Sequence, residues 1–161
     1  AMESAFRAQK KYEDEVYDEG LRYIEYADKN GLTIAVLSGR PYHIDPEINH
    51  GINQLIASCE MAVITEDVAA RLAEVPQVNV LNQWTYHSRM YASAEYVKNK
   101  QNAQLIQLVS FGCGIDSITS DEIRSIVEES GKIYTQLKID EINNLGAARI
   151  RIRSLKAAID R

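Results

Sequence analysis

The stretch LTIAVLSGRP, residues 32–41, joins an apolar run of strand length to an abrupt turn. A continuous apolar run bounded by turn residues is typical of a strand that is buried on both faces of a sheet. The turn residues Ser38, Gly39, Arg40 and Pro41 follow the run directly. The stretch therefore predicts a core strand whose carboxyl end opens into a polar loop.

Helical and strand patterns alternate on both sides of this stretch. The end of the first helix is marked by Asn30-Gly31 and the start of the second by Asp45-Pro46. Helical patterns cover residues 4–29, 46–59, 68–73, 83–99, 119–131 and 140–158, and strand patterns cover 61–65, 104–110 and 132–139, with 78–81 as a minor strand. This alternation predicts right-handed crossovers and a parallel sheet. We expect an α/β fold: a three-layer Rossmann-like or flavodoxin-like domain with a mostly parallel sheet of four to five strands.

The composition limits the class of protein. The chain has 161 residues, 45% of them hydrophobic and 25% charged, as in one globular domain. A net charge of −5 disfavours a nucleic-acid partner, and no apolar run approaches the length of a membrane span. Two cysteines are too few for a disulfide framework, so we expect a reducing, cytoplasmic location.

Polar residues follow each expected strand and predict one shared site. In a parallel sheet these loops line a crevice at the carboxyl edge. The candidates in the crevice are Arg40, Tyr42, His43, Glu66, Asp67, Cys113, Asp116, Asp140 and Glu141.

Cys113 has several possible roles. The glycines at positions 112 and 114 leave the thiol reachable, because neither has a Cβ to cover it. Cys113 could be a metal or cluster ligand, a nucleophile, or a small residue that merely fits the loop. His43 or His87 could approach it as a base, although no sequence signature supports a hydrolase. Cys59 is most simply a buried small hydrophobe.

Arg40 is a candidate for binding an anion. The preceding glycine lets a ligand approach the backbone, Arg40 could grip phosphate or carboxylate, and the helix beginning at Pro46 offers free N–H groups. The sequence contains neither GxGxxG nor a P-loop lysine, so a nucleotide fingerprint is missing. The alternative is a tight turn with a surface arginine. His43 and His50 do not form a recognised ligand pair, which favours structural or capping roles.

Several unusual strings together resemble one family. They are SGRPYHIDPEINHG at residues 38–51, SFGCGID at 110–116, and KIDE at 138–141 with NLGAARIR at 144–151. They look like the large CoA-substrate-specific enzyme activases, or acyl-CoA dehydratase activase-related proteins, of anaerobic bacteria. The resemblance runs from about Leu32 to Ala158 and concerns the region similar to 2-hydroxyacyl-CoA dehydratase subunits, not the ATPase modules.

The resemblance implies a site shared with other domains. Dehydratases of this kind hold a [4Fe-4S] cluster through cysteines on different domains, which makes Cys113 the position most like a metal ligand. Arg40, Tyr42, His43, Asp116, Asp140 and Glu141 would then lie on the acyl-CoA side of a composite site. The chain would be excised from a larger protein, with a helix at residues 1–31 packed on a domain at 32–161, and would be inactive alone. The alternative is a non-catalytic module that binds a small anion or docks against a partner domain.

Overall fold

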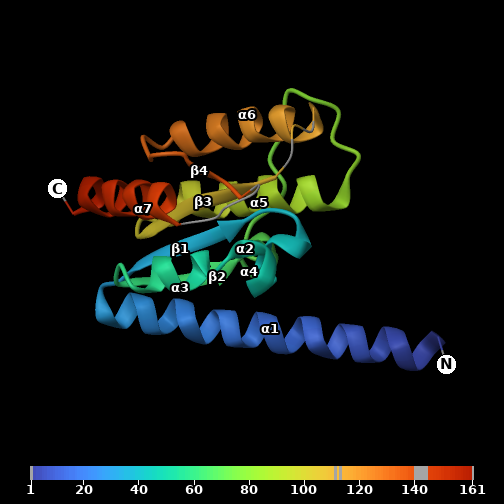
Figure 1. Cartoon of the computed structure of the whole chain (residues 1–161). Helices are drawn as coiled ribbons and strands as arrows, with labels where there is room; N and C mark the ends of the chain where they lie inside the picture. The colour runs from blue at the N-terminus through green and yellow to red at the C-terminus, as the bar shows by residue number, and fades with distance from the viewer. Residues whose placement is uncertain (1, 111, 113, 140–144, 161) are drawn as a thin grey trace.

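Four parallel strands form the centre of the molecule. The computed structural model describes residues 2–110, 112, 114–139 and 145–160. Strands β1 (Thr33–Ser38), β2 (Met61–Thr65), β3 (Ala103–Val109) and β4 (Thr135–Lys138) pair in the order β2-β1-β3-β4 (Figure 1). The predicted α/β class and parallel sheet are confirmed.

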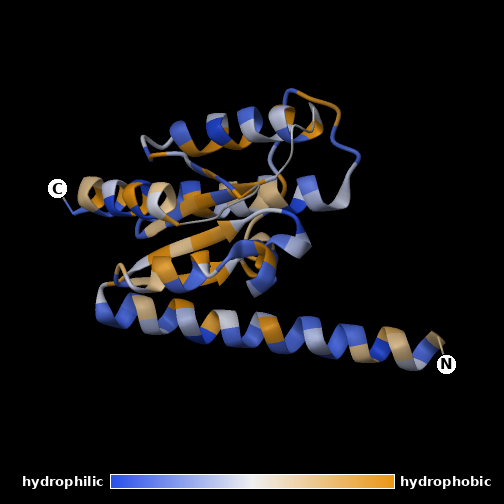
Figure 2. Ribbon diagram, in the orientation of Figure 1, coloured by the Kyte–Doolittle hydropathy of each residue, from blue (hydrophilic) through white to orange (hydrophobic). Residues whose placement is uncertain are grey.

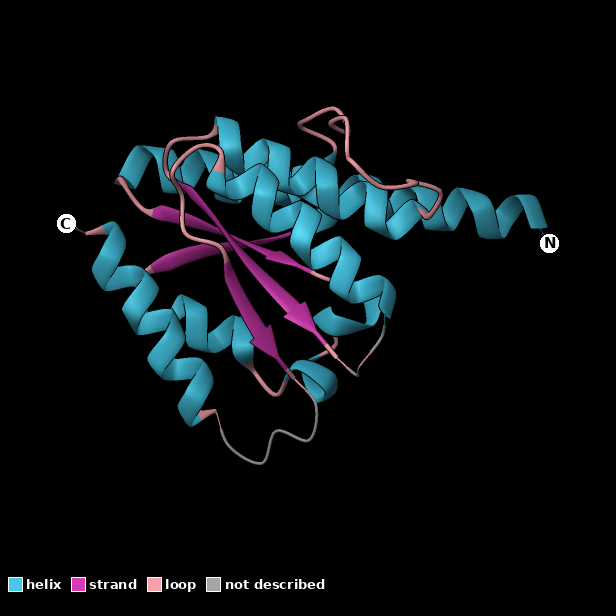
Figure 3. Cartoon of the chain, turned by 90° about the horizontal axis from the view of Figure 1, so that it is seen from above, coloured by secondary structure: helices cyan, strands magenta, loops and turns pink. Residues whose placement is uncertain are grey.

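Helices connect the strands across both faces of the sheet. After α1 (Met2–Asn30) and β1, the elements are a 3-10 turn η1 (Pro41–Ile44), α2 (Pro46–Asn49), α3 (Ile52–Ala57), α4 (Glu66–Ala70), α5 (Thr85–Asn99), α6 (Gly114–Glu128) and α7 (Gly146–Ile159). Figure 3 shows the strands fanned between helices on either side. The predicted three-layer arrangement is therefore present.

The alternating side chains of the strands build two separate cores. Ile34 and Val36 of β1 pack on one face with α1, α4, α5 and α6. Ala35 and Leu37 pack on the opposite face with α3 and α7. Figure 2 shows hydrophobic colour along the strands and on the helix sides that face them. Strands β1 and β2 are near-continuous apolar runs in the sequence, as expected for strands between two cores, whereas β3 and β4 contain glutamines.

Helix α1 packs on the sheet through its second half only. Gly20 and Ala27 are buried in it, whereas residues 2–13 are exposed. Val68 of α4 lies so close to Gly20 that a Cβ there would collide with it. Within the described residues, no helix has the length and apolar character needed to cross a lipid bilayer.

Some predicted elements differ from the structure. Asp45 caps the helix at Pro46 as expected, but the helix does not continue to residue 59. His50 and Gly51 take the left-handed conformation, with φ of 53° and 80°, and divide it into α2 and α3. The prediction of a single helix over residues 46–59 was wrong because two consecutive residues with positive φ interrupt the helical hydrogen bonds.

Two further boundaries were wrong. Residues 78–81 form no strand, because Val78 and Val80 pack against one core without a neighbouring strand to pair with among the described residues. Thr119 does not cap a helix: α6 begins at Gly114, and the Thr119 hydroxyl donates to the carbonyl of Ile115 one turn back. The early start of α6 matters because it brings Asp116 into the first turn.

Candidate functional site: a polar cluster at the switch point of the sheet

The carboxyl ends of β1 and β3 form the switch point of the sheet. These two strands are neighbours, yet the chain leaves β1 toward β2 on one side and leaves β3 toward β4 on the other. The connections therefore diverge at this point, and it is at such switch points that open α/β sheets bind ligands. Arg40 follows β1, Ser110 follows β3, and α6 begins at Gly114.

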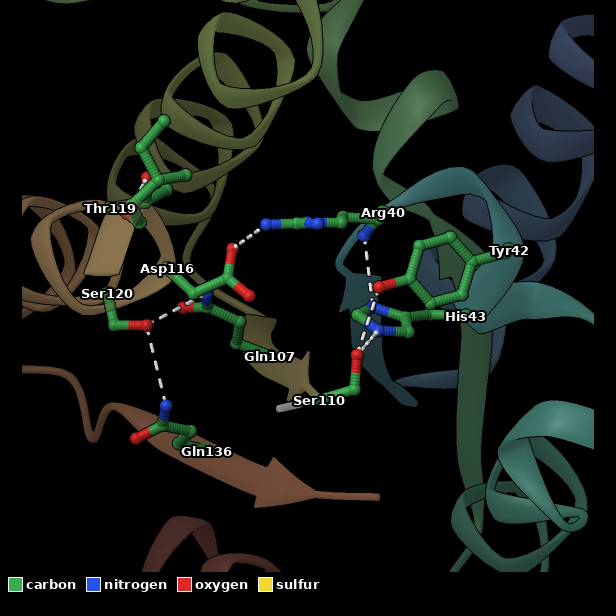
Figure 4. Close-up of polar contacts among 10 residues, drawn as sticks. Arg40, Tyr42, His43, Gln107, Ser110, Asp116, Thr119, Ser120 and Gln136 are labelled. Carbon is green, nitrogen blue, oxygen red and sulfur yellow. Dashed lines mark hydrogen bonds and ion pairs between the residues drawn. The ribbon is translucent and has the colours of Figure 1, made fainter. Parts of the chain in front are cut away.

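An ion pair joins the turn after β1 to the first turn of α6. One guanidinium nitrogen of Arg40 lies 2.6 Å from Oδ1 of Asp116 (Figure 4). The side chains are 26% and 12% exposed, so water screens the pair less than a surface pair. Asp116 lies in the first turn of α6, where a negative charge also stabilises the helix dipole. Its Oδ2 is buried without a hydrogen-bond partner among the described residues.

A second set of contacts joins the turn after β1 to the end of β3. The backbone N–H of Arg40 donates to Nδ1 of His43 at 3.0 Å, and Nε2 of His43 lies 3.1 Å from the Ser110 hydroxyl. The Tyr42 hydroxyl lies 2.9 Å from the same oxygen. Because Nδ1 accepts a hydrogen bond, the proton of the neutral imidazole is on Nε2, which donates to Ser110.

This hydrogen-bond pattern is unlike a hydrolytic triad. In a triad the histidine donates through Nδ1 to a carboxylate and accepts the nucleophile's proton at Nε2. His43 does the opposite at both nitrogens, and it is 2% exposed. The contacts of His43 therefore hold the turn after β1 against β3 and do not activate Ser110.

His87 lies beside the ion pair and has unused hydrogen-bonding capacity. It is 8% exposed, and neither ring nitrogen has a hydrogen-bond partner among the described residues. Burial lowers the pKa of His87, Arg40 lowers it further, and Asp116 raises it. The Trp84 ring meets the imidazole edge to face, with 6.3 Å between centroids. A buried neutral imidazole of this kind is available to donate to or accept from a ligand.

A buried polar layer lies beneath the site and positions α6. The amide of Gln107 on β3 donates to the Ser120 hydroxyl at 3.2 Å and accepts from Tyr134 at 2.7 Å. Gln136 of β4 donates to Ser120 at 3.4 Å (Figure 4). These bonds fix α6 over β3 and β4, and so they fix Asp116 opposite Arg40.

The acidic residues after β2 have structural contacts of their own. Glu66 is 2% exposed and pairs with Arg89 of α5. Burial raises the pKa of Glu66 to about 7, although Arg89 acts in the opposite direction. Asp67 accepts hydrogen bonds from the Thr65 hydroxyl and from the backbone N–H of Val68. Asp67 therefore holds the first turn of α4.

Four of the predicted site residues converge on the switch point. They are Arg40, Tyr42, His43 and Asp116. Cys113, Asp140 and Glu141 lie outside the described residues. Sequence reasoning did not include Ser110 as a site residue and considered His87 only as a neighbour of Cys113. The position of Ser110 directly after a strand was a signal that could have found it.

The described residues do not by themselves fit a metal cluster. No group of three or more His, Cys, Asp or Glu side chains among them could hold a metal ion. Cys59 precedes β2 and therefore lies at the amino edge of the sheet, at the end opposite the switch point. It packs against the core beside α3, which agrees with a small hydrophobic role.

The fold and the cluster define an α/β protein with a polar cluster at the switch point of its parallel sheet. Comparison with known families gives a match over residues 1–69 to the family described as CoA enzyme activase uncharacterised domain (DUF2229). The matched residues contain Arg40, Tyr42 and His43, and the match confirms the predicted relationship to the CoA enzyme activases. No curated protein and no solved structure matches the chain.

Proposed function

We propose that the switch-point cluster binds the anionic part of an acyl-CoA ester, within a larger CoA enzyme activase-related protein. The family match supports a CoA-linked role, and the position of Arg40 beside the buried, unsatisfied His87 carries the proposal. Arg40 offers a planar donor fork suited to phosphate and carboxylate.

Ligand binding at this cluster would be an exchange of anions. Asp116 already pairs with Arg40, so a ligand phosphate or carboxylate would replace or share that contact. The N-terminus of the 15-residue helix α6 supports negative charge at the same place. His87 would then donate one ring N–H to the ligand. The cluster binds and orients in this proposal, and it performs no covalent step.

A titration with CoA ligands tests this proposal. The chain is titrated by calorimetry with acetyl-CoA, with CoA and with pyrophosphate. We expect saturable binding of acetyl-CoA and at least a tenfold weaker affinity in Arg40→Gln. The exposed Arg22, paired with Glu19 on α1, supplies the control variant Arg22→Gln, which should bind normally. The proposal would be overturned if acetyl-CoA gave only the heat of dilution. It would also be overturned if Arg40→Gln bound acetyl-CoA as tightly as the unchanged chain.

We further propose that Cys113 supplies one ligand of an iron–sulfur cluster in a dehydratase-like composite site. Support comes from the sequence resemblance and from the switch-point location of Ser110 and Gly114, which lie on either side of Cys113 in the sequence. Other domains would supply the remaining ligands, since Cys59 lies at the opposite edge.

Anaerobic reconstitution of the full-length protein should give less bound iron in Cys113→Ser, and as much iron in Cys59→Ser as in the unchanged protein. Unchanged iron in Cys113→Ser would contradict the assignment.

The partners we propose follow from the same resemblance. They are the other domains of the larger protein and an acyl-CoA, in the cytoplasm of an anaerobic bacterium and without nucleic acid or a membrane. The net charge of −5 and the use of only two cysteines support this view.

A further inference from the structure

Strand β2 has an unusual free edge. It pairs with β1 on one side, and no strand among the described residues pairs with its other side. Proteins protect such an edge with lysine, proline or a bulge, or by covering it with a helix or loop. The β2 sequence MAVIT contains no charged residue and no proline. The free edge of β2 therefore has the chemistry of a strand that accepts another strand.

A groove of about 500 Å³ runs along this edge. Residues of β2 line it together with α1 on one side and α2 and α3 on the other. Tyr23 and Tyr26 of α1 are 50% and 58% exposed and form one wall. Asn53 and Ala57 of α3 belong to the opposite wall. The two helices thus flank the strand edge without closing it.

Two side-chain amides in this groove have unused hydrogen-bonding groups. Asn49 is fully buried, and its Oδ1 accepts the backbone N–H of Gly51 at 2.9 Å, which fixes the orientation of the amide. Its Nδ2 donor has no partner among the described residues, and neither does Oδ1 of Asn53. Buried polar groups are normally satisfied. The Asn49 donor and the Asn53 acceptor correspond to the two hydrogen-bonding groups of a peptide unit, one C=O and one N–H.

The charge of the groove restricts the occupant further. Glu60, at the amino end of β2, is the only charged residue among those that line the groove. A cationic side chain is therefore favoured at one end of an occupant, and uncharged side chains along the rest. Strand addition supplies affinity through main-chain hydrogen bonds and specificity through alternate side chains.

We propose that this groove binds an extended peptide segment of another polypeptide, which adds to the sheet beside β2. The segment has uncharged residues of high β-propensity and one lysine or arginine over Glu60. The Asn49 and Asn53 amides hydrogen-bond to its backbone, and Tyr23 and Tyr26 cover its side chains. The inference is independent of CoA binding, since it uses none of the switch-point residues.

Fluorescence anisotropy of a labelled peptide tests the inference. The probe is a capped hexapeptide of alternating valine and threonine with one terminal lysine, titrated with the full chain. We expect saturable binding, and hydrogen exchange at residues 61–65 should slow when the peptide binds. The same peptide N-methylated at alternate amides cannot pair along one edge, and it should bind at least tenfold more weakly.

Matched variants separate the groove from general effects. Ala57→Arg fills the groove and should weaken binding at least tenfold, whereas Ala157→Arg, also at an exposed alanine but on α7, should not. Equal binding of the N-methylated peptide, or equal affinity in Ala57→Arg, would overturn the proposal. A dimer that dissociates when peptide is added would also overturn it, because a second copy would then be the occupant.

Discussion

The switch-point cluster and the groove beside β2 differ in how many of their hydrogen-bonding groups are paired within the chain. At the switch point, Arg40 pairs with Asp116 and the Tyr42 and His43 side chains share the hydroxyl of Ser110. In the groove, β2 has no neighbouring strand on one side, and the amides of Asn49 and Asn53 each have one group without a partner among the described residues.

This difference predicts how strongly replacements in each region affect stability, and both regions are proposed binding sites. Contacts within the cluster join segments that are far apart in the chain, so replacing them should destabilise the fold. Tyr23 and Tyr26 of the groove are 50% and 58% exposed, so replacing them should change binding and leave stability nearly intact. The following variants test this contrast, in order of decreasing expected loss of stability.

Gly39→Ala should give the largest loss of stability. A Cβ at this position would lie 2.5 Å from Nδ1 of His43 and 3.2 Å from the carbonyl oxygen of Leu108. Backbone and imidazole must both shift, which costs about 3 kcal/mol. Urea denaturation measures the change. Gly114→Ala at the same edge has open space around its Cβ and should not destabilise, so equal losses in both variants would contradict the steric argument.

Glu66 should make stability depend on pH. Its pKa is raised from 4.5 to about 7 by burial, against the influence of Arg89. Between these values the folded chain binds more protons than the unfolded chain, so the free energy of unfolding falls as pH rises through the window. The expected fall is on the order of 2 kcal/mol. Glu66→Gln should flatten it, with chemical denaturation from pH 4.5 to 7.5 as the measurement.

His87 changes the free energy of unfolding with pH in the opposite direction. It does so equally in the unchanged chain and in Glu66→Gln. Its lowered pKa makes the unfolded chain bind more protons below about pH 6.5, so this group adds stability as pH rises. The difference between the two profiles of unfolding free energy against pH therefore gives the contribution of Glu66 alone. An identical slope in Glu66→Gln would show that the buried carboxylate titrates normally.

Arg40→Gln should destabilise the chain moderately by leaving Asp116 without its ionic partner. The pair is partly exposed, so the expected loss is about 1.5 kcal/mol in urea denaturation. Adding Asp116→Asn should restore part of the loss, because the unpaired charge is then removed. The control is Arg22→Gln, whose exposed pair with Glu19 should contribute less than about 0.5 kcal/mol. Equal losses would remove the distinction between the cluster and the surface.

Tyr23→Ala should have the smallest effect on stability and a clear effect on recognition. Tyr23 is half exposed, so the loss should stay below about 0.5 kcal/mol, while the hexapeptide should bind several-fold more weakly. Tyr12→Ala on the same helix is the matched control, since Tyr12 is 62% exposed and lies outside the groove. Weaker binding in both variants would point to α1 as a whole, not to the groove.

The cluster was partly predictable because position along a strand is a local property. Arg40, Tyr42 and His43 follow an apolar run, so their place at the carboxyl edge could be inferred from the sequence. The bond between His43 and Ser110 joins residues 67 positions apart and could not. The partners of Gln107 in the polar layer were hidden for the same reason.

The class of the fold could be read from the chain alone. Apolar runs of strand length that alternate with helical patterns predict a parallel sheet covered on both faces, whatever the strand order. The order β2-β1-β3-β4 was apparent only in the folded molecule. That order places the switch point at Arg40 and leaves one edge of β2 free. Strand order depends on how the helices pack across the sheet, and such long-range packing leaves no periodic trace in the sequence.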